Sequence, residues 1–213
     1  MKLLNLDIER IAHDTFRIAG SQRVFTDPFK VAKSDDADIV LISHEHFDHL
    51  SLEDLSKVCT PATTIVASSN CRKGLADVKV KEKRFLDPGG KTKVGSVEIE
   101  AVPAYNLNKF REPGHVFHPK EYGGVGFVIR MDGTTVYYAG DTDHIPEMKS
   151  IQCDIALLPV SGTYVMTAEE AAAAAADINP QIAVPMHYGA IVGGEEDAKR
   201  LKSLVKNCEV IIV

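Results

Sequence analysis

The sequence lacks the features that would place it in a membrane or on an export route. No apolar run in its 213 residues approaches the ~18–20 residues that cross a bilayer. Its first residues, MKLLNLDIER, contain no long apolar segment of the signal-peptide kind. We therefore expect a cytoplasmic protein with no membrane partner.

Patterns for covalent catalysis or a disulfide framework are also missing. The four cysteines (Cys59, Cys71, Cys153 and Cys208) are scattered, with no Cys-x-x-Cys spacing. Free thiols in a reducing compartment are therefore expected rather than disulfides or a cysteine zinc site. No Gly-x-Ser-x-Gly turn is present, so a serine nucleophile has no support.

Positive charge is scarce. The chain has 24 Lys and Arg against 30 Asp and Glu, a net charge of −6. This balance disfavours nucleic acid as a partner, because such partners are held by broad basic surfaces. It does not exclude a phosphoester substrate, since a bound metal can supply positive charge locally.

The pattern of predicted elements favours the α/β class, with strands first and strands alternating with helices later. A long loop over residues 105–124 is unusual for a compact domain, and such loops are often functional. No linker or repeat marks a boundary, so residues 1–213 are expected to form a single domain. Strands are predicted over 16–18, 24–26, 38–43, 63–67, 79–85, 97–102, 125–131, 134–138, 154–159, 182–185 and 210–213, and helices from residue 51 and over 69–76, 167–178 and 194–206. The strands 79–85 and 97–102 are expected to pair antiparallel around the turn-rich segment 87–90.

Metal-ligand residues are densest in Ser43-His44-Glu45-His46-Phe47-Asp48-His49, directly after the apolar run 39–42. In an extended loop, side chains two residues apart point the same way, so His44 and His46 can coordinate one metal ion. Asp48 and His49 can then face a second ion. A surface loop that is histidine-rich by chance is the alternative, and the density of ligands at a strand end disfavours it.

Two further ligand-type residues follow predicted strands. Asp141 follows the strand 134–138, and Gly140 before it lets the backbone approach a site closely. His187 follows the strand 182–185. Taken alone, Asp141 would be interpreted as a turn cap and His187 as a structural residue. Their shared position at strand ends favours a metal site instead.

The remaining histidines carry weaker signals. His115 and His118 lie in the long loop, and their spacing alone does not decide whether one of them reaches the site. For His13, just before the first predicted strand, a structural role is favoured slightly over a functional one. His144 is interpreted as a solvated loop residue.

The motif His44-x-His46-x-Asp48-His49, the Gly-Asp-Thr at 140–142 and the late His187 resemble the metallo-β-lactamase fold superfamily of metal-dependent hydrolases. The segments GDTDHIPEM and PMHYG are similar to the small cytosolic subgroup that includes L-ascorbate 6-phosphate lactonase. The resemblance implies a four-layer αββα sandwich with the site at one edge between the sheets. It also implies His44 and His46 on one metal, Asp48, His49 and His187 on the other, and Asp141 bridging.

The chain departs from this family at one position. The superfamily usually supplies another histidine after the strand ending near residue 102, where this chain has Pro103-Ala104-Tyr105-Asn106. Either the first metal lacks a ligand, or a histidine of the long loop replaces it. We favour His118, because its segment leads into the next strand.

These residues predict a metal-dependent hydrolase in which a metal-bound hydroxide attacks a small metabolite, a phosphorylated or acidic ester or lactone. Asp48 would orient the hydroxide and accept its proton, while Tyr105, Asn106 and Tyr164 would line the pocket. One or two divalent ions are expected, zinc foremost, with manganese, nickel or iron as alternatives. The rival functions are a phosphodiesterase or nuclease and a non-catalytic metal-binding module. A homo-oligomer is compatible with the sequence.

Overall fold

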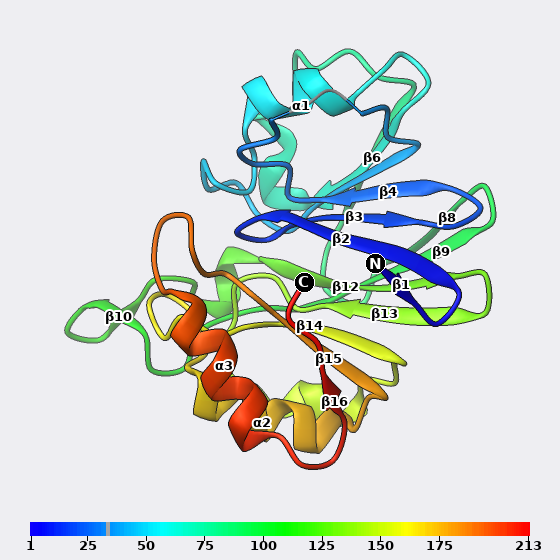
Figure 1. The fold of residues 1–213 in the computed structure, drawn as a ribbon. Coiled ribbons are helices and arrows are strands. Elements are labelled where there is room, and N and C mark those ends of the chain that lie inside the picture. Colours follow the sequence, from blue (N-terminus) through cyan, green and yellow to red (C-terminus); the bar gives the residue numbers. More distant parts are fainter. Residues whose placement is uncertain (33–34) are drawn as a thin grey trace.

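The computed structural model describes residues 1–32 and 35–213. Two seven-stranded sheets pack face to face, with helices on their outer faces (Figure 1). The first sheet runs in the order β1 (Lys2–Leu3), β2 (Leu6–Ala12), β3 (Thr15–Ala19), β4 (Arg23–Thr26), β5 (Ile39–Ile42), β6 (Thr64–Ser68) and β7 (Glu82–Leu86). The second runs β16 (Glu209–Val210), β15 (Ile182–Met186), β14 (Ile155–Pro159), β13 (Thr134–Tyr138), β12 (Val125–Met131), β9 (Val97–Pro103) and β8 (Lys91–Val94).

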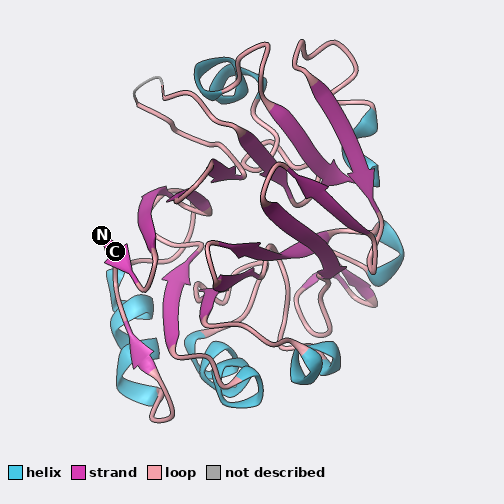
Figure 2. Cartoon of the chain, turned by 90° about the vertical axis from the view of Figure 1, so that its right-hand side faces the viewer, coloured by secondary structure: helices cyan, strands magenta, loops and turns pink. Residues whose placement is uncertain are grey.

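The helices cover the outside of this sandwich. Helix α1 (Leu52–Val58) lies over the first sheet, and α2 (Ala168–Ile178) and α3 (Glu195–Leu204) lie over the second (Figure 1). Figure 2 shows the helices on the outside of the strands. A short hairpin of β10 (Phe110–Glu112) and β11 (His115–Val116) projects from the side. The predicted αββα architecture is therefore confirmed. Within the described residues, no helix is long and apolar enough to cross a membrane.

Local sequence explains the main elements. Every residue of β5 is buried, as is typical of a parallel strand covered on both faces, and β5 lies parallel to β4 and β6. Helix α1 begins after Ser51, whose side chain accepts a hydrogen bond from the backbone of Asp54. Helix α2 begins with the predicted capping box of Thr167 and Glu170.

Strand direction determines where the functional residues lie. Strands β4 and β5 run parallel in the first sheet, and β13, β14 and β15 run parallel in the second. The carboxyl ends of parallel strands meet at one edge of a sheet, so the loops that follow these strands are brought together. All the predicted ligands except His118 lie in these loops.

Several predicted elements differ from the structure. The segments 79–85 and 97–102 were expected to pair with each other, but β7 pairs with β6 and β9 pairs with β8 and β12. Residues 87–90 therefore connect the two sheets. The helix expected over 69–76 is only a 3₁₀ turn at Ser69–Arg72, and the last strand is only Glu209–Val210. The prediction overlooked β1, β2 and β8, and also the β10–β11 hairpin within the long loop, because their pairing depends on partners that local pattern does not reveal.

Candidate metal centre

Three imidazoles meet at the first of two donor clusters, which we call the first metal position: His44, His46 and His118. Nε2 of His44 lies 3.0 Å from Nδ1 of His46, and Nε2 of His118 lies 3.2 Å from the same atom. A tetrahedral zinc with Zn–N bonds of ~2.0–2.1 Å separates its ligand nitrogens by about 3.3 Å. The three nitrogens therefore fit one ion.

The second metal position consists of Asp48, His49 and His187. The ligand atoms of these residues lie within 4.8 Å of one another. Nε2 of His49 and Nε2 of His187 are buried and have no hydrogen-bond partner among the residues that the structure describes. Leaving buried polar atoms unpaired is costly, so a cation that binds them explains why they converge.

Asp141 lies between the two positions. Its carboxylate oxygens are 3.4 Å from Nε2 of His49 and 3.5 Å from Nε2 of His187. On the other side they are 3.5 Å from Nε2 of His118 and 4.0 Å from Nε2 of His44. This placement suits a carboxylate that bridges two cations.

Hydrogen bonds to Nδ1 orient four of these imidazoles, among them His44, whose Nδ1 is bonded to the hydroxyl of Ser43 at 3.0 Å. Nδ1 of His49 is bonded to Asp27 at 2.6 Å, and Nδ1 of His187 to the hydroxyl of Ser161 at 2.9 Å. Nδ1 of His118 is bonded to Oδ1 of Asn106 at 3.0 Å. Each bond leaves Nε2 directed at the cluster, which is how outer partners usually prepare metal-binding histidines.

The electrostatics of the two positions differ. Burial lowers the pKa of His44 well below its ordinary value and that of His118 to about 4, so both rings are neutral near pH 7. Burial also acts on His187, but the carboxylates of Asp141 and Asp14 outweigh it and raise its pKa to about 9. The second position is thus rich in negative charge, which a cation would neutralise.

The sequence profile of a family described as the β-lactamase superfamily domain matches residues 7–187 of the chain. The chain belongs to the metallo-β-lactamase fold superfamily. It also belongs to the UPF0173 metal-dependent hydrolases: it is 36% identical to the member from Methanoculleus marisnigri over 212 residues, covering 95% of this chain and 90% of that protein.

Solved structures agree with this assignment. A candidate metal-dependent hydrolase from Parabacteroides distasonis superposes with a TM-score of 0.80 at 35% identity, covering 97% of this chain and 92% of that one. A metallo hydrolase from Ignicoccus hospitalis, Igni18, superposes with a TM-score of 0.76 at 23% identity, covering 98% of this chain and 94% of that one. The prediction of a metal-dependent hydrolase is confirmed. The closer resemblance to the ascorbate 6-phosphate lactonase subgroup stays a prediction.

This metallo-β-lactamase fold hydrolase has a cavity of about 410 Å³ over the cluster of residues that could hold metal. Tyr164 lines this cavity, as predicted. The centroid of its ring lies 4.6 Å from that of Phe117, in an edge-to-face contact. Phe47, Phe117, Ile191 and the ring of Tyr164 form its apolar walls, and its polar groups are His46, Asp48, Arg111, His118 and Asp141.

Two residues predicted to line the pocket lie elsewhere. The hydroxyl of Tyr105 donates to Glu147 at 3.0 Å, outside the residues that line this cavity. Asn106 is only 4% exposed and uses its amide to hold His118 and to donate to the carbonyl of Tyr164. Asn106 is therefore a positioning residue rather than a contact for substrate.

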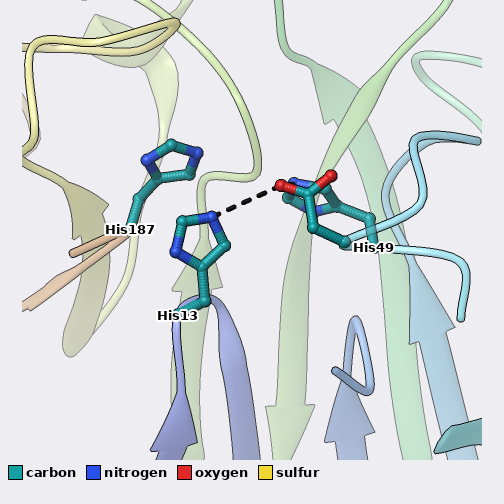
Figure 3. A group of neighbouring side chains, drawn as sticks. His13, His49 and His187 are labelled. Carbon is teal, nitrogen blue, oxygen red and sulfur yellow. Dashed lines mark ion pairs between the residues drawn. The ribbon is translucent and has the colours of Figure 1, made fainter. Parts of the chain in front are cut away.

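Of the four histidines with weaker sequence signals, two lie in the cluster and two lie outside it. His118 reaches the cluster, whereas the side chain of His115 is 75% exposed on the β10–β11 hairpin. His144 bonds Asp177 at 2.8 Å, away from the cluster. His13, to which the sequence assigned a structural role, lies inside the cluster, as Figure 3 shows together with His49 and His187. Its position follows from the pairing of β2 with β3, which the sequence did not predict.

Two carboxylates were also overlooked. Asp14 lies in the turn beside His13, and Asp27 follows β4 at the edge where the ligands meet. Both side chains are completely buried. Asp27 directly precedes Pro28, a pattern typical of an ordinary turn. The available signal was that Asp27 also follows a short apolar strand, as Asp141 and His187 do.

Proposed function

We propose that this chain hydrolyses a small metabolite that carries an ester or lactone bond together with a phosphate or carboxylate group. The proposal rests on the position of Arg111, which lines the cavity beside the candidate metal ligands. It makes no ion pair with any residue in the described part of the chain. Cζ of its guanidinium lies 5.5 Å from the centroid of the Phe117 ring. An anionic group on the substrate would give this exposed guanidinium a partner.

The shape and lining of the cavity support a small substrate. Its volume of about 410 Å³ is in the range of small-molecule sites, roughly 300–1,000 Å³. Phe47, Phe117 and Ile191 provide apolar walls for the carbon skeleton. Arg111 is the cationic contact beside these walls.

The residues present fit one or two divalent ions, with zinc proposed at the first metal position because its three imidazoles suit a tetrahedral ion. Bound divalent ions would lower the pKa of water and stabilise negative charge on the substrate. Asp48 lines the cavity, and its side chain is 15% exposed. Burial raises its pKa, but His13 and His49 outweigh that effect and keep it below the ordinary value. Asp48 can therefore orient a water molecule through a carboxylate oxygen and accept its proton.

A phosphodiesterase acting on nucleic acid is less well supported. Among the described residues that line the cavity, Arg111 is the only Lys or Arg. Binding a strand requires several phosphate contacts. The nearby Lys109 is held by Glu170 at 2.7 Å and by Asp143 at 3.3 Å, so its charge is already balanced.

The test is a substrate panel with the metal-loaded protein: phosphorylated and carboxylated lactones and esters, their neutral analogues, and bis(p-nitrophenyl) phosphate. We expect turnover of the anionic small substrates. We expect the variant His46→Ala to lose that turnover and to bind one equivalent of metal less than the wild type. The control, His115→Ala, removes an exposed histidine outside the cluster. Preferred turnover of the diester would favour the phosphodiesterase. Metal binding without turnover of any substrate would favour the non-catalytic module. Cytoplasmic location and homo-oligomer formation stay predictions.

A further inference from the structure

His13 and Asp14 are buried without partners beside the second metal position. Both side chains are completely buried. Both nitrogens of His13 and both carboxylate oxygens of Asp14 lack a hydrogen-bond partner within the described structure. Burying a polar group without a partner is costly, so four such atoms in adjacent residues require an explanation.

Their distances connect them to the second metal position. Nε2 of His13 lies 3.5 Å from Oδ2 of Asp48, and its ring centroid lies 4.1 Å from that of His187. Oδ2 of Asp14 lies 3.7 Å from Nε2 of His49 and 3.9 Å from Nε2 of His187. These separations exceed hydrogen-bond lengths and are close to those between ligands of one ion.

The backbone holds His13 in a strained conformation that directs it to this place. Its φ of 45° is in the left-handed region, which non-glycine residues seldom adopt. The carbonyl of His13 accepts hydrogen bonds from the backbone of His187 at 3.2 Å and from Nε of Arg10 at 3.3 Å. Such strain is retained mainly where the surrounding structure and the function require it.

We propose that His13 and Asp14 are additional ligands of the second metal position. This position would then offer three imidazoles and at least two carboxylates, whereas the first offers three imidazoles and a share of Asp141. A site with five or six nitrogen and oxygen donors suits Mn²⁺ or Fe²⁺, while a three-imidazole site with one open place suits Zn²⁺. The two positions would therefore select different metals. The proposal depends on metal binding at this centre and not on the identity of the substrate.

The test starts from metal-free protein loaded with one equivalent of Zn²⁺ and then titrated with Mn²⁺. The Mn²⁺ affinity of the wild type is compared with that of His13→Asn and Asp14→Asn, with metal content measured by mass spectrometry. Asparagine is chosen at position 13 because it tolerates left-handed backbone. His144→Asn and Asp177→Asn are the matched controls, because they change a histidine–aspartate pair outside the cluster.

Removing only an outer partner of a metal ligand commonly weakens metal binding 10–100-fold. Removing a ligand itself should weaken it at least as much, so we expect the Mn²⁺ affinity of either variant to fall by at least about 10-fold. The zinc content should be unchanged. Folding of each variant is checked by circular dichroism. Wild-type Mn²⁺ affinity in both variants would overturn the proposal.

A measurement on the wild type keeps the proposal testable even where the variants fail to fold. Pulsed electron paramagnetic resonance of the bound Mn²⁺, with ¹⁵N-labelled histidine, counts the coordinated imidazoles. We expect three, from His13, His49 and His187. Two imidazoles would overturn the role of His13 and leave the hydrolase assignment standing. Failure to bind any metal would contradict the proposed function as well.

Discussion

The carboxylate of Asp27 and Nδ1 of His49 are joined by a 2.6 Å hydrogen bond between two completely buried side chains. Asp27 also accepts hydrogen bonds from the backbone of Ser43 at 2.7 Å and from the hydroxyl of Tyr138 at 2.6 Å. Tyr138 belongs to the second sheet and Asp27 follows a strand of the first. One carboxylate thus fixes both the ring of His49 and the contact between the sheets.

Asp27→Asn should weaken metal binding at the second position by about 10–100-fold, because the imidazole loses the partner that fixes its tautomer and orientation. Competition with a chelating dye measures this loss. Asp154→Asn is the control, since Asp154 accepts a backbone bond from Thr135 at 2.8 Å away from the metal-ligand cluster. Equal affinity in the two variants would show that Asp27 has no role in metal binding.

Asn106→Ala should weaken zinc binding at the first metal position by about 10-fold or more, because His118 loses the acceptor for Nδ1. Titration of metal-free protein with Zn²⁺ gives the affinity. The adjacent Asn108→Ala removes an exposed bond to Glu170 and should leave zinc binding unchanged. If Asn106→Ala binds zinc as tightly as wild type, His118 is oriented by other contacts.

Arg111→Gln should raise KM for anionic substrates by about 10–100-fold, since a hydrogen bond between charged groups contributes ~1.5–3 kcal/mol. KM for a neutral analogue of the same substrate should change little. Arg130→Gln is the control, because Arg130 lies 3.6 Å from Glu100 on the second sheet and does not line the cavity. An equal rise in KM for charged and neutral substrates would contradict charge recognition by Arg111.

Asp54 should contribute stability that depends on pH. Burial raises its pKa, but hydrogen bonds from Lys57, Ser51 and the backbone of Val31 and Lys30 outweigh that effect and hold the pKa below its ordinary value. A lowered pKa stabilises the folded state above the unfolded value of about 3.9, and the stabilisation is lost as pH falls through the folded value.

Asp54→Asn should therefore lower the free energy of unfolding by about 1–3 kcal/mol at pH 6, and this difference should shrink below pH 4. Urea unfolding of metal-free protein across this pH range measures both quantities. Asp77→Asn, which changes an exposed carboxylate nearby, should have little effect. A difference that is constant from pH 6 to pH 3 would contradict the role of the charge.

Much of the site could be predicted from local pattern, because parallel strands deliver the residues that follow them to one edge. Asp141 and His187 follow β13 and β15, and the histidine loop follows β5. His118 was favoured over His115 only because its segment leads into the next strand, and the structure brings His118 to the first metal position. Whether these residues bind metal stays a prediction.

The rest depended on pairing between distant segments. His13 and Asp14 occupy a turn whose position is fixed only when β2 pairs with β3. Their residue types also suit an ordinary surface turn. For the same reason the sequence did not show that β7 and β9 belong to different sheets. Their patterns allow a hairpin, and only the burial gained with β6 and β12 decides the pairing.

Each metal position draws on both sheets of the sandwich. His44 and His46 come from the first sheet and His118 from the loop beyond β9 of the second. Asp48 and His49 are likewise joined by His187 from the other side. Ions bound here would cross-link the two halves of the chain, so their binding energy would oppose separation of the sheets. Chelation should therefore lower the melting temperature, and the metal-free protein should open first along the seam between its two sheets.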